Sequence, residues 1–480
     1  MSDASSAQIE LSLSTGATMR VAAITPHVFR VRLRPDGDFA EPGLVRYGIV
    51  EGQPGDVALS VSDEDGAVTL DSGEASLTVS RADGRLTLRD AAGEVVLADA
   101  EAPVSDPEQG FRASFALTEG ERLYGLGDET RDRLNKRGHE TPMVLRNVVS
   151  YVPIPFLMST GGWAVLVNST WFHHVDAGAN DPDRLVFSVR QGELDLYLIA
   201  GATLPELLDH YTQVSGRPAV LPLWAYGLTW VCDDRGVRAR DVLYEAHMFR
   251  REGIPLDAIG LEPCWMQTRY DFSVDKQWNE ETFHQPFWKP HQEHGGFVGG
   301  LNNMGFKLSL WLCCDYDLSE YEELLLAGDG GADGAEDDGA QASLLAADRY
   351  DEDVIRDPHF VPRYQDTITK RGEPWFEHLK KFVDNGAAAF KMDGANQICF
   401  HPDRRWYNGM DDAEMHNLYP VLLAKQMSRG FSDHTGRRSM IYTAGGYAGI
   451  QQFAATWAGD TGGAEKPLAV SYTHLRAHET

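Results

Sequence analysis

The chain has 480 residues and a formal net charge of −29 at pH 7, with a sequence pI near 4.9. Such an acidic balance argues against a nucleic acid or an anionic membrane surface as a partner, because both recruit proteins through basic patches. No apolar run reaches the roughly 18 residues of a membrane span. Hydrophobic residues make up 42% of the chain, enough for a sizeable core, and the length predicts two or three domains.

The N-terminus and the cysteines indicate a cytoplasmic protein. Residues 1–5 have neither the basic start nor the apolar stretch of a secretory signal. The cysteines are scattered, odd in number and without metal-ligand spacing, which is typical of free thiols in a reducing compartment. They are Cys232, Cys264, Cys313, Cys314 and Cys399. We therefore expect no metal and no cofactor, and the sequence does not indicate an oligomeric state.

Residues 1–222 are predicted to form an N-terminal antiparallel β-sandwich. Short segments that alternate apolar and polar residues are separated by turn signals such as Asp65-Gly66 and Asp83-Gly84, a pattern typical of sandwiches. The predicted strands include Met19–Ala23, Val28–Leu33, Ala67–Leu70, Ala75–Val79, Leu86–Leu88, Val95–Leu97, Trp163–Asn168 and Leu194–Ile199. A helix is expected over Leu204–Val214, and Gly216-Arg217-Pro218 to Pro222 marks the domain boundary.

Residues 223–468 show a different period, in which strands alternate with helices. The predicted strands are Tyr226–Val231, Ala258–Leu261, Phe306–Leu312, Ala387 to Asp393, Ser439–Thr443 and Thr456–Ala458. The predicted helices include Arg238–Arg251, Glu377–Asp384 and Asp412–Arg429. This alternation predicts a parallel sheet, and at this size a (β/α)8 TIM barrel, although only about six strands precede the end of the sequence. The acidic stretch Gly328–Asp338 is expected to be a solvated surface loop.

Polar and aromatic residues gather where the predicted barrel strands end. The clusters are Trp230 with Asp233-Asp234, Glu262-Pro263-Cys264-Trp265, Trp311 with Asp315, Lys391 with Asp393, and Trp457-Ala458-Gly459-Asp460. A single Lys–Asp pair can be no more than a salt bridge that closes a strand. Five clusters on successive strands, however, meet at the mouth of a barrel, where active sites lie.

Two carboxylates in these clusters, Asp393 and Asp460, belong to different strands and have tryptophans beside them. Cleavage of a glycosidic bond needs one carboxylate that attacks the anomeric carbon and a second, protonated one that donates to the leaving oxygen. Aromatic side chains provide platforms for a sugar ring. The strand ends therefore predict a carbohydrate substrate.

The chain resembles glycoside hydrolase family 31, the retaining α-glycosidases, from about Leu123 to Leu468. The matching pieces are Tyr124-Gly125-Leu126-Gly127-Asp128-Glu129, Gly216-Arg217-Pro218, Gly253-Ile254-Pro255-Leu256-Asp257, Phe390-Lys391-Met392-Asp393, Met415-His416-Asn417 and Trp457-Ala458-Gly459-Asp460. The resemblance implies that Asp393 is the nucleophile and Asp460 the acid/base. It also implies a double displacement through a covalent glycosyl-enzyme. The expected substrate-binding residues are Glu262, Trp265, Trp311, Lys391, Asn396, His416 and Trp457.

Three departures from the family pattern bear on the sugar. Glu262 stands where members acting on glucosides or xylosides usually have aspartate, and Asn396 stands where they often have glutamate. Tyr442-Thr443-Ala444 replaces a segment that carries an arginine. An α-galactoside or an N-acetylated α-galactosaminide is therefore an alternative substrate. α-Transglycosylation and a catalytically silent carbohydrate-binding protein are the alternative activities.

The end of the sequence predicts a truncated barrel. The resemblance fades after Leu468, and residues 469–480 are expected to be a non-native tail, with a natural variable tail as the alternative. A barrel stopped after six strands leaves backbone groups and apolar surface uncovered. On this ground the 480-residue chain is expected to be inactive, and a core of about residues 1–220 should resist proteolysis.

Overall fold

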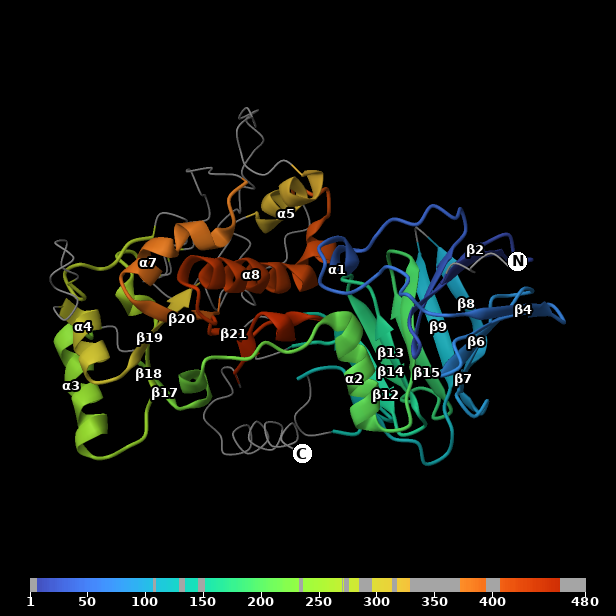
Figure 1. Cartoon of the computed structure of the whole chain (residues 1–480), viewed down its shortest axis with the longest axis horizontal. Helices are drawn as coiled ribbons and strands as arrows, with labels where there is room; N and C mark the ends of the chain where they lie inside the picture. The colour runs from blue at the N-terminus through green and yellow to red at the C-terminus, as the bar shows by residue number, and fades with distance from the viewer. Residues whose placement is uncertain are drawn as a thin grey trace.

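The computed structural model places two halves side by side, a β-rich half and a half of parallel strands and helices (Figure 1). Among the described residues, no helix is long and apolar enough to cross a membrane. The structure describes residues 7–106, 109–128, 134–145, 152–232, 236–269, 271, 276–284, 296–312, 317–328, 372–393 and 406–457. Several predictions, namely those for Asp460, Asn396, the acidic stretch after Gly328 and the tail 469–480, lie outside these residues.

The N-terminal half consists of two antiparallel sheets, as predicted. The first sheet contains, in spatial order, β1 (Gln8–Ser12), β2 (Thr18–Thr25), β3 (Val28–Arg34), β16 (Leu194–Ala200), β13 (Trp163–Val167), β12 (Phe156–Ser159) and β10 (Leu123–Gly125). The second contains β11 (Glu140–Met143), β14 (His173–Ala177), β15 (Arg184–Val189), β9 (Gly110–Ala116), β8 (Val95–Asp106), β7 (Leu86–Asp90), β6 (Ala75–Ser80), β5 (Ala67–Asp71) and β4 (Ser60–Glu64).

The alternating sequence pattern accounts for these sheets. In β6, Ala75, Leu77 and Val79 are buried, while the residues between them are half-buried. A period of two places one face of each strand in a shared core and the other toward solvent. The two sheets bury one continuous apolar cluster, which explains why the sandwich has its own core.

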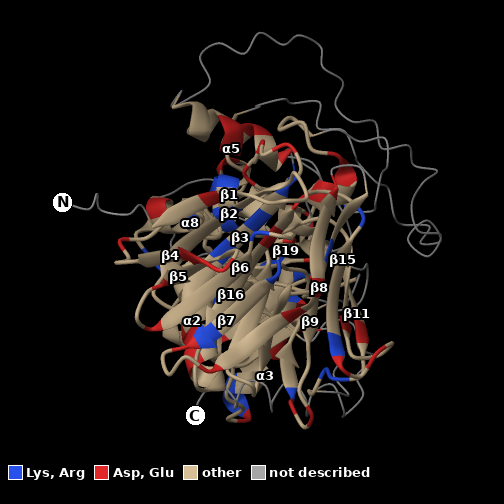
Figure 2. Ribbon diagram, turned by 90° about the vertical axis from the view of Figure 1, so that its right-hand side faces the viewer, with Lys and Arg blue, Asp and Glu red and all other residues tan. Residues whose placement is uncertain are grey.

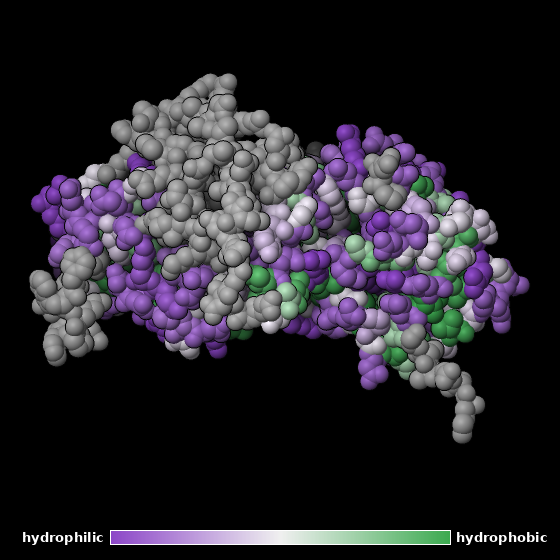
Figure 3. All heavy atoms as spheres, turned by 90° about the horizontal axis from the view of Figure 1, so that it is seen from above, coloured by the Kyte–Doolittle hydropathy of each residue, from purple (hydrophilic) through white to green (hydrophobic). Residues whose placement is uncertain are grey.

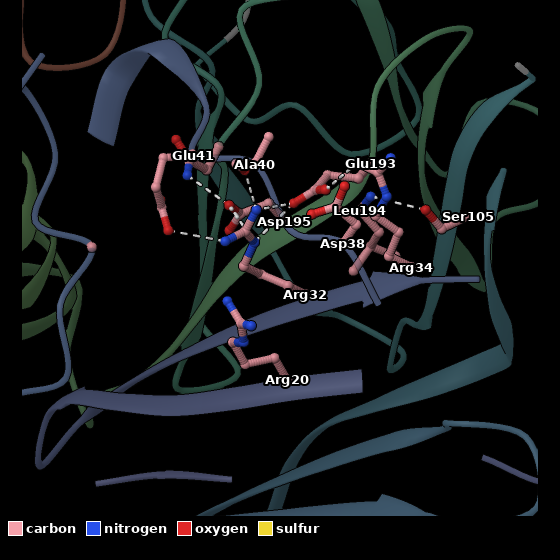
Figure 4. A network of polar contacts seen from close by, with 12 residues as sticks. Arg20, Arg32, Arg34, Asp38, Ala40, Glu41, Ser105, Glu193, Leu194 and Asp195 are labelled. Carbon is pink, nitrogen blue, oxygen red and sulfur yellow. Dashed lines mark hydrogen bonds and ion pairs between the residues drawn. The ribbon is translucent and has the colours of Figure 1, made fainter. Parts of the chain in front are cut away.

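Ion pairs between charged side chains link neighbouring segments of the first sheet. Figure 2 shows basic residues along β2 and β3 among scattered acidic ones. Arg30 and Arg32 are almost fully buried and pair with Asp195, Glu41 and Glu193. Figure 4 shows Arg32 among these carboxylates, and the Arg32 Nη1–Glu41 Oε1 distance is 3.0 Å. Because both arginines pair with carboxylates and Asp195 belongs to β16, the network holds β3 against β16.

Two short elements connect the sandwich to the second half. The first is α1 (Gly43–Arg46), and the second is α2 (Leu204–Ser215), whose N-cap Thr203 accepts a hydrogen bond from the Glu206 backbone. Tyr211 of α2 stacks on Phe156 of the sandwich, with ring centroids 4.0 Å apart. The predicted helix Leu204–Val214 is thus confirmed.

The second half is built on a parallel sheet whose six described strands lie side by side in sequence order. They are β17 (Thr229–Cys232), β18 (Ala258–Leu261), β19 (Lys307–Leu312), β20 (Ala387–Met392), β21 (Ile441–Thr443) and β22 (Ala455–Thr456). Every residue of β18 is buried, as expected for a parallel strand covered on both faces. The predicted series of barrel strands is confirmed over this range.

Helices alternate with these strands. They are α3 (Ala239–Arg251), α4 (Gly296–Asn303), α5 (Leu318–Ala327), α7 (Lys380–Asp384) and α8 (Asp412–Thr435), with short 3-10 helices η1 (Leu223–Tyr226), η2 (Pro263–Trp265), η4 (Trp375–His378) and η5 (Ile450–Gln452). Seen from above, the described surface over this half is mainly hydrophilic, and apolar patches gather toward the sandwich end (Figure 3).

Several predicted boundaries in this half were wrong. Tyr226 belongs to the 3-10 helix that follows Pro222, so the first strand begins at Thr229. The predicted helix Glu377–Asp384 is divided between η4 and α7, because η4 ends at His378 and Leu379 separates it from the α-helix. Helix α8 extends to Thr435 and stops at Gly436, which adopts the left-handed conformation that favours glycine, with φ 65°.

Helix α8 ties the two halves together. The Asn417 side chain is fully buried, and its Oδ1 accepts a hydrogen bond from the Leu145 N–H at 3.0 Å. Its Nδ2 donates to the carbonyl oxygens of Met143 and Thr170 at 3.2 and 2.9 Å. Lys425, further along α8, donates to the carbonyl oxygen of Tyr47. These bonds fix the sandwich against the barrel helix.

Candidate active site

The register of the parallel sheet brings three predicted strand ends together. Trp311 of β19 pairs with Lys391 of β20, and Lys391 pairs with Tyr442 of β21. Paired residues of parallel strands project from the same face, so these three side chains form one layer. Glu262 directly follows β18, Asp393 directly follows β20, and Trp457 directly follows β22. The carboxyl ends of the strands thus collect polar and aromatic groups, as expected for a barrel mouth.

Lys391 is the centre of this cluster. Its Nζ donates to Glu262 Oε1 at 2.8 Å and lies 3.8 Å from Asp393 Oδ2. The same ammonium lies 5.0 Å from the centre of the Trp457 ring, within the range of a cation–π contact. Burial lowers the pKa of Lys391, but the charges of Asp393 and Glu262 outweigh this effect and raise it above the ordinary value. Lys391 is therefore a fixed positive charge between two carboxylates.

Asp393 is held in place from two sides. Its Oδ2 accepts a hydrogen bond from Trp311 Nε1 at 2.8 Å, and its backbone N–H donates to the carbonyl oxygen of Leu312 at 3.1 Å. Trp311 is fully buried, so its indole is a rigid donor. The Asp393 side chain keeps 16% exposure, which leaves the carboxylate accessible to a ligand. The site thus presents an oriented carboxylate at the end of a buried strand.

Glu262 differs from Asp393 in its setting. It directly follows β18, its backbone N–H donates to the carbonyl oxygen of Cys232 at 3.1 Å, and its side chain is only 10% exposed. The bond to Lys391 is the shorter of the two lysine–carboxylate contacts. Glu262 therefore accepts a direct hydrogen bond from Lys391, whereas Asp393 accepts one from Trp311.

Two predicted substrate-binding residues lie apart from the Lys391 cluster. Trp265 is completely buried, and its Nε1 donates to the backbone carbonyl of Trp311 at 2.9 Å, so it supports Trp311 from behind. His416 Nε2 lies 3.0 Å from the carbonyl oxygen of Leu145, and its ring meets the edge of Phe172. Both Leu145 and Phe172 belong to the N-terminal half. The described contacts of Trp265 and His416 are therefore those of packing residues.

The prediction missed Tyr442 as a member of the site. Its hydroxyl lies 2.8 Å from the Ser309 hydroxyl, and its ring meets Trp457 edge-on with centroids 5.6 Å apart. Burial raises the pKa of Tyr442 to about 12, so the phenol stays neutral. The sequence signal was the departure at Tyr442-Thr443-Ala444, which showed an unusual strand end but not the direction of the side chain.

The described residues do not suggest a metal centre, because no group of three or more His, Cys, Asp or Glu side chains among them could hold an ion. A lysine between the carboxylates instead supplies the positive charge. The arrangement can position and orient a nucleophilic carboxylate beside aromatic surfaces, which suits a neutral, hydroxyl-rich ligand.

Comparisons with known proteins match both halves. Residues 218–477, more than half of the chain, match the model described as the glycosyl hydrolases family 31 TIM-barrel domain. Residues 18–176 match the glycosyl hydrolase 31 N-terminal galactose mutarotase-like domain. An alpha-xylosidase of Emericella nidulans is 25% identical over 373 residues, which cover 76% of this chain and 45% of that protein. Alpha-glucosidase 2 of Bacillus thermoamyloliquefaciens is 22% identical, covering 90% of this chain and 54% of that protein.

Solved structures show the same fold. A family 31 dextranase of Flavobacterium johnsoniae in complex with glucose has a TM-score of 0.74 at 20% identity, covering 95% of this chain and 55% of that one. A family 31 alpha-xylosidase from a soil metagenome in complex with xylose has a TM-score of 0.73 at 18% identity, covering 97% and 68%. The chain thus spans about half the length of several relatives. From the family models and the fold together, the chain belongs to glycosyl hydrolase family 31.

Proposed function

We propose that this protein is a retaining α-glycosidase that hydrolyses terminal non-reducing α-linked sugars, with Asp393 as the nucleophile and Asp460 as the acid/base. The observation that carries the proposal is the Asp393 carboxylate, which Trp311 Nε1 and the Lys391 ammonium hold at the end of a barrel strand in a family 31 chain. A nucleophile must be ionised and oriented, and an indole N–H and a nearby ammonium supply both conditions.

The reaction follows a double displacement. The Asp393 carboxylate attacks the anomeric carbon while Asp460 donates a proton to the leaving oxygen, and water then cleaves the glycosyl-enzyme with Asp460 as base. Lys391 compensates the two carboxylates Glu262 and Asp393 at rest. When Asp393 becomes an ester it loses its charge, and Lys391 stays paired with Glu262. The Lys391–Glu262 pair therefore keeps the site near neutrality through the covalent step.

The relatives suggest the substrate class. Their names include alpha-xylosidase and alpha-glucosidase, and solved neighbours hold glucose, isomaltotriose or xylose. For this chain we propose a hexose or pentose α-glycoside. Glu262, which is longer than the usual aspartate by one methylene and is bound to Lys391, keeps an α-galactoside or N-acetylgalactosaminide as the second candidate.

A mechanism-based label tests the nucleophile in this chain directly. A panel of 5-fluoro-α-glycosyl fluorides (gluco, xylo, galacto and N-acetylgalactosamino) should esterify Asp393, which peptide mass spectrometry will locate. Asp393→Asn should abolish labelling. Asp384→Asn removes a carboxylate that pairs with His434 on the surface and should leave it intact. A label on another carboxylate would refute the assignment.

A further inference from the structure

Tyr442 and Ser309 join two strands that are not neighbours. Tyr442 belongs to β21 and Ser309 to β19, with β20 between them, yet their hydroxyls are 2.8 Å apart. Two strand spacings amount to about 9.6 Å, so the phenol ring must cross the inner face of β20. Ala389 of β20 pairs with Ser309 and has a side chain small enough to lie beneath the ring. The ring therefore crosses β20 on its way from β21 to β19.

This bridge lies deeper than the charged groups. Ser309 precedes Trp311 by two residues on the same face, which places it about 6.6 Å further from the strand ends. Tyr442 itself pairs with Lys391, and its ring leads from that layer down to Ser309. The same ring contacts Trp457 edge-on. An aromatic ring and two neutral hydroxyls thus lie one layer deeper than the ammonium and the carboxylates on β19 to β21.

A sugar bound for cleavage must adopt one orientation above the Tyr442–Ser309 pair. Its anomeric carbon must face Asp393 near the strand ends, and the leaving group must point out of the mouth. In a pyranose ring, C4 lies across from C1, so the C4 substituent points inward. This step rests on the proposed function, because it takes Asp393 as the nucleophile.

We propose that Tyr442 is a specificity-determining residue that reads the C4 position of the sugar and excludes any group attached to O4. The Tyr442–Ser309 pair offers neutral hydroxyl donors and acceptors to a free C4 hydroxyl. A substituent on O4 would have to occupy the space that the Tyr442 ring fills next to Ser309. Tyr442 thereby restricts binding to the non-reducing end of a chain, since an internal 4-linked sugar carries a substituent on O4.

The test compares free sugars with their 4-O-methyl derivatives on this chain. Binding of D-glucose, D-galactose, D-xylose and N-acetyl-D-galactosamine, each beside its 4-O-methyl form, is measured by saturation-transfer NMR titration. One misplaced methyl group in a shaped pocket discriminates by about 10-fold or more. We therefore expect the sugar that binds best to be preferred over its 4-O-methyl form by about 10-fold, and Tyr442→Ala and Tyr442→Leu to reduce this ratio to about 2-fold.

Two variants separate the ring from other effects. Tyr442→Phe keeps the ring and should keep the exclusion of the 4-O-methyl sugar. Tyr244→Ala removes an exposed tyrosine of α3 and should leave the ratio unchanged. The inference is overturned if the parent binds both forms equally or if Tyr442→Leu keeps the parental ratio. It is also overturned if a folded Tyr442→Leu loses both ligands, which would make the role structural. Failure of the parent to bind any sugar would instead refute the proposed function itself.

Discussion

Replacement of Lys391 by methionine should destabilise the barrel half strongly, because it leaves two carboxylates facing each other. The Lys391 Nζ lies 2.8 Å from Glu262 Oε1 and 3.8 Å from Asp393 Oδ2, so these oxygens are at most about 6.6 Å apart. At an effective dielectric constant of about 20, two like charges at that distance repel by about 2.5 kcal/mol. The parent contains this repulsion too, but there the lysine offsets it. Removal of the lysine leaves both buried carboxylates without a compensating charge, and the expected loss in the free energy of unfolding is about 3 kcal/mol.

Urea unfolding of the chain at pH 7, followed by tryptophan fluorescence, measures this loss. Lys380→Met is the matched control, because Lys380 donates to Glu377 over the same 2.8 Å on the surface, and its removal should change the midpoint little. The double variant Lys391→Met/Glu262→Gln removes one of the repelling charges and should recover much of the stability. A Lys391→Met midpoint as close to the parent as that of Lys380→Met would refute the reasoning.

The pH dependence of the same variant has a defined sign. The pKa of Lys391 is raised in the folded state above its usual 10.5, so its contribution to stability is fully present below that value. The contribution declines only as the pH rises through the higher folded-state pKa. The parent should therefore lose stability relative to Lys391→Met above about pH 10.5. A difference between the two that stays constant up to pH 12 would contradict the assigned ion pairs.

Three further outcomes are expected. Trp311→Phe removes the Nε1 donor to Asp393 and should slow covalent labelling about 10-fold, whereas an unchanged labelling rate would contradict the orienting role. Asn417→Ala removes three hydrogen bonds between the halves and should cost about 3 kcal/mol, seen as two separate unfolding transitions; a single unshifted transition would contradict the coupling. Burial raises the pKa of both Tyr442 and Tyr211 to about 12, so Tyr442→Phe should lower the amplitude of the late step of tyrosinate absorbance at alkaline pH by about one tyrosine, and an unchanged amplitude would contradict the burial of Tyr442.

The two-part architecture and the residue types at the strand ends could be predicted from the sequence. Alternating segments gave the sandwich strands, and strand–helix alternation gave the parallel sheet, because these periods follow from local backbone geometry. Lys391 and Asp393 were recognisable as site residues because a strand buried on both faces has no packing reason to carry them.

Which side chains of the site contact one another depends on the tertiary structure. Lys391 pairs more closely with Glu262, 129 residues away, than with Asp393 beside it, because strand register and side-chain direction set the contact. The Tyr442–Ser309 bridge depends on the small Ala389 on the strand between them. Trp265 and His416 are residue types that suit sugar binding. Trp265 of η2, however, contacts Trp311, and His416 of α8 contacts Leu145. Pairings across such distances arise from packing of the whole chain, which no local pattern records.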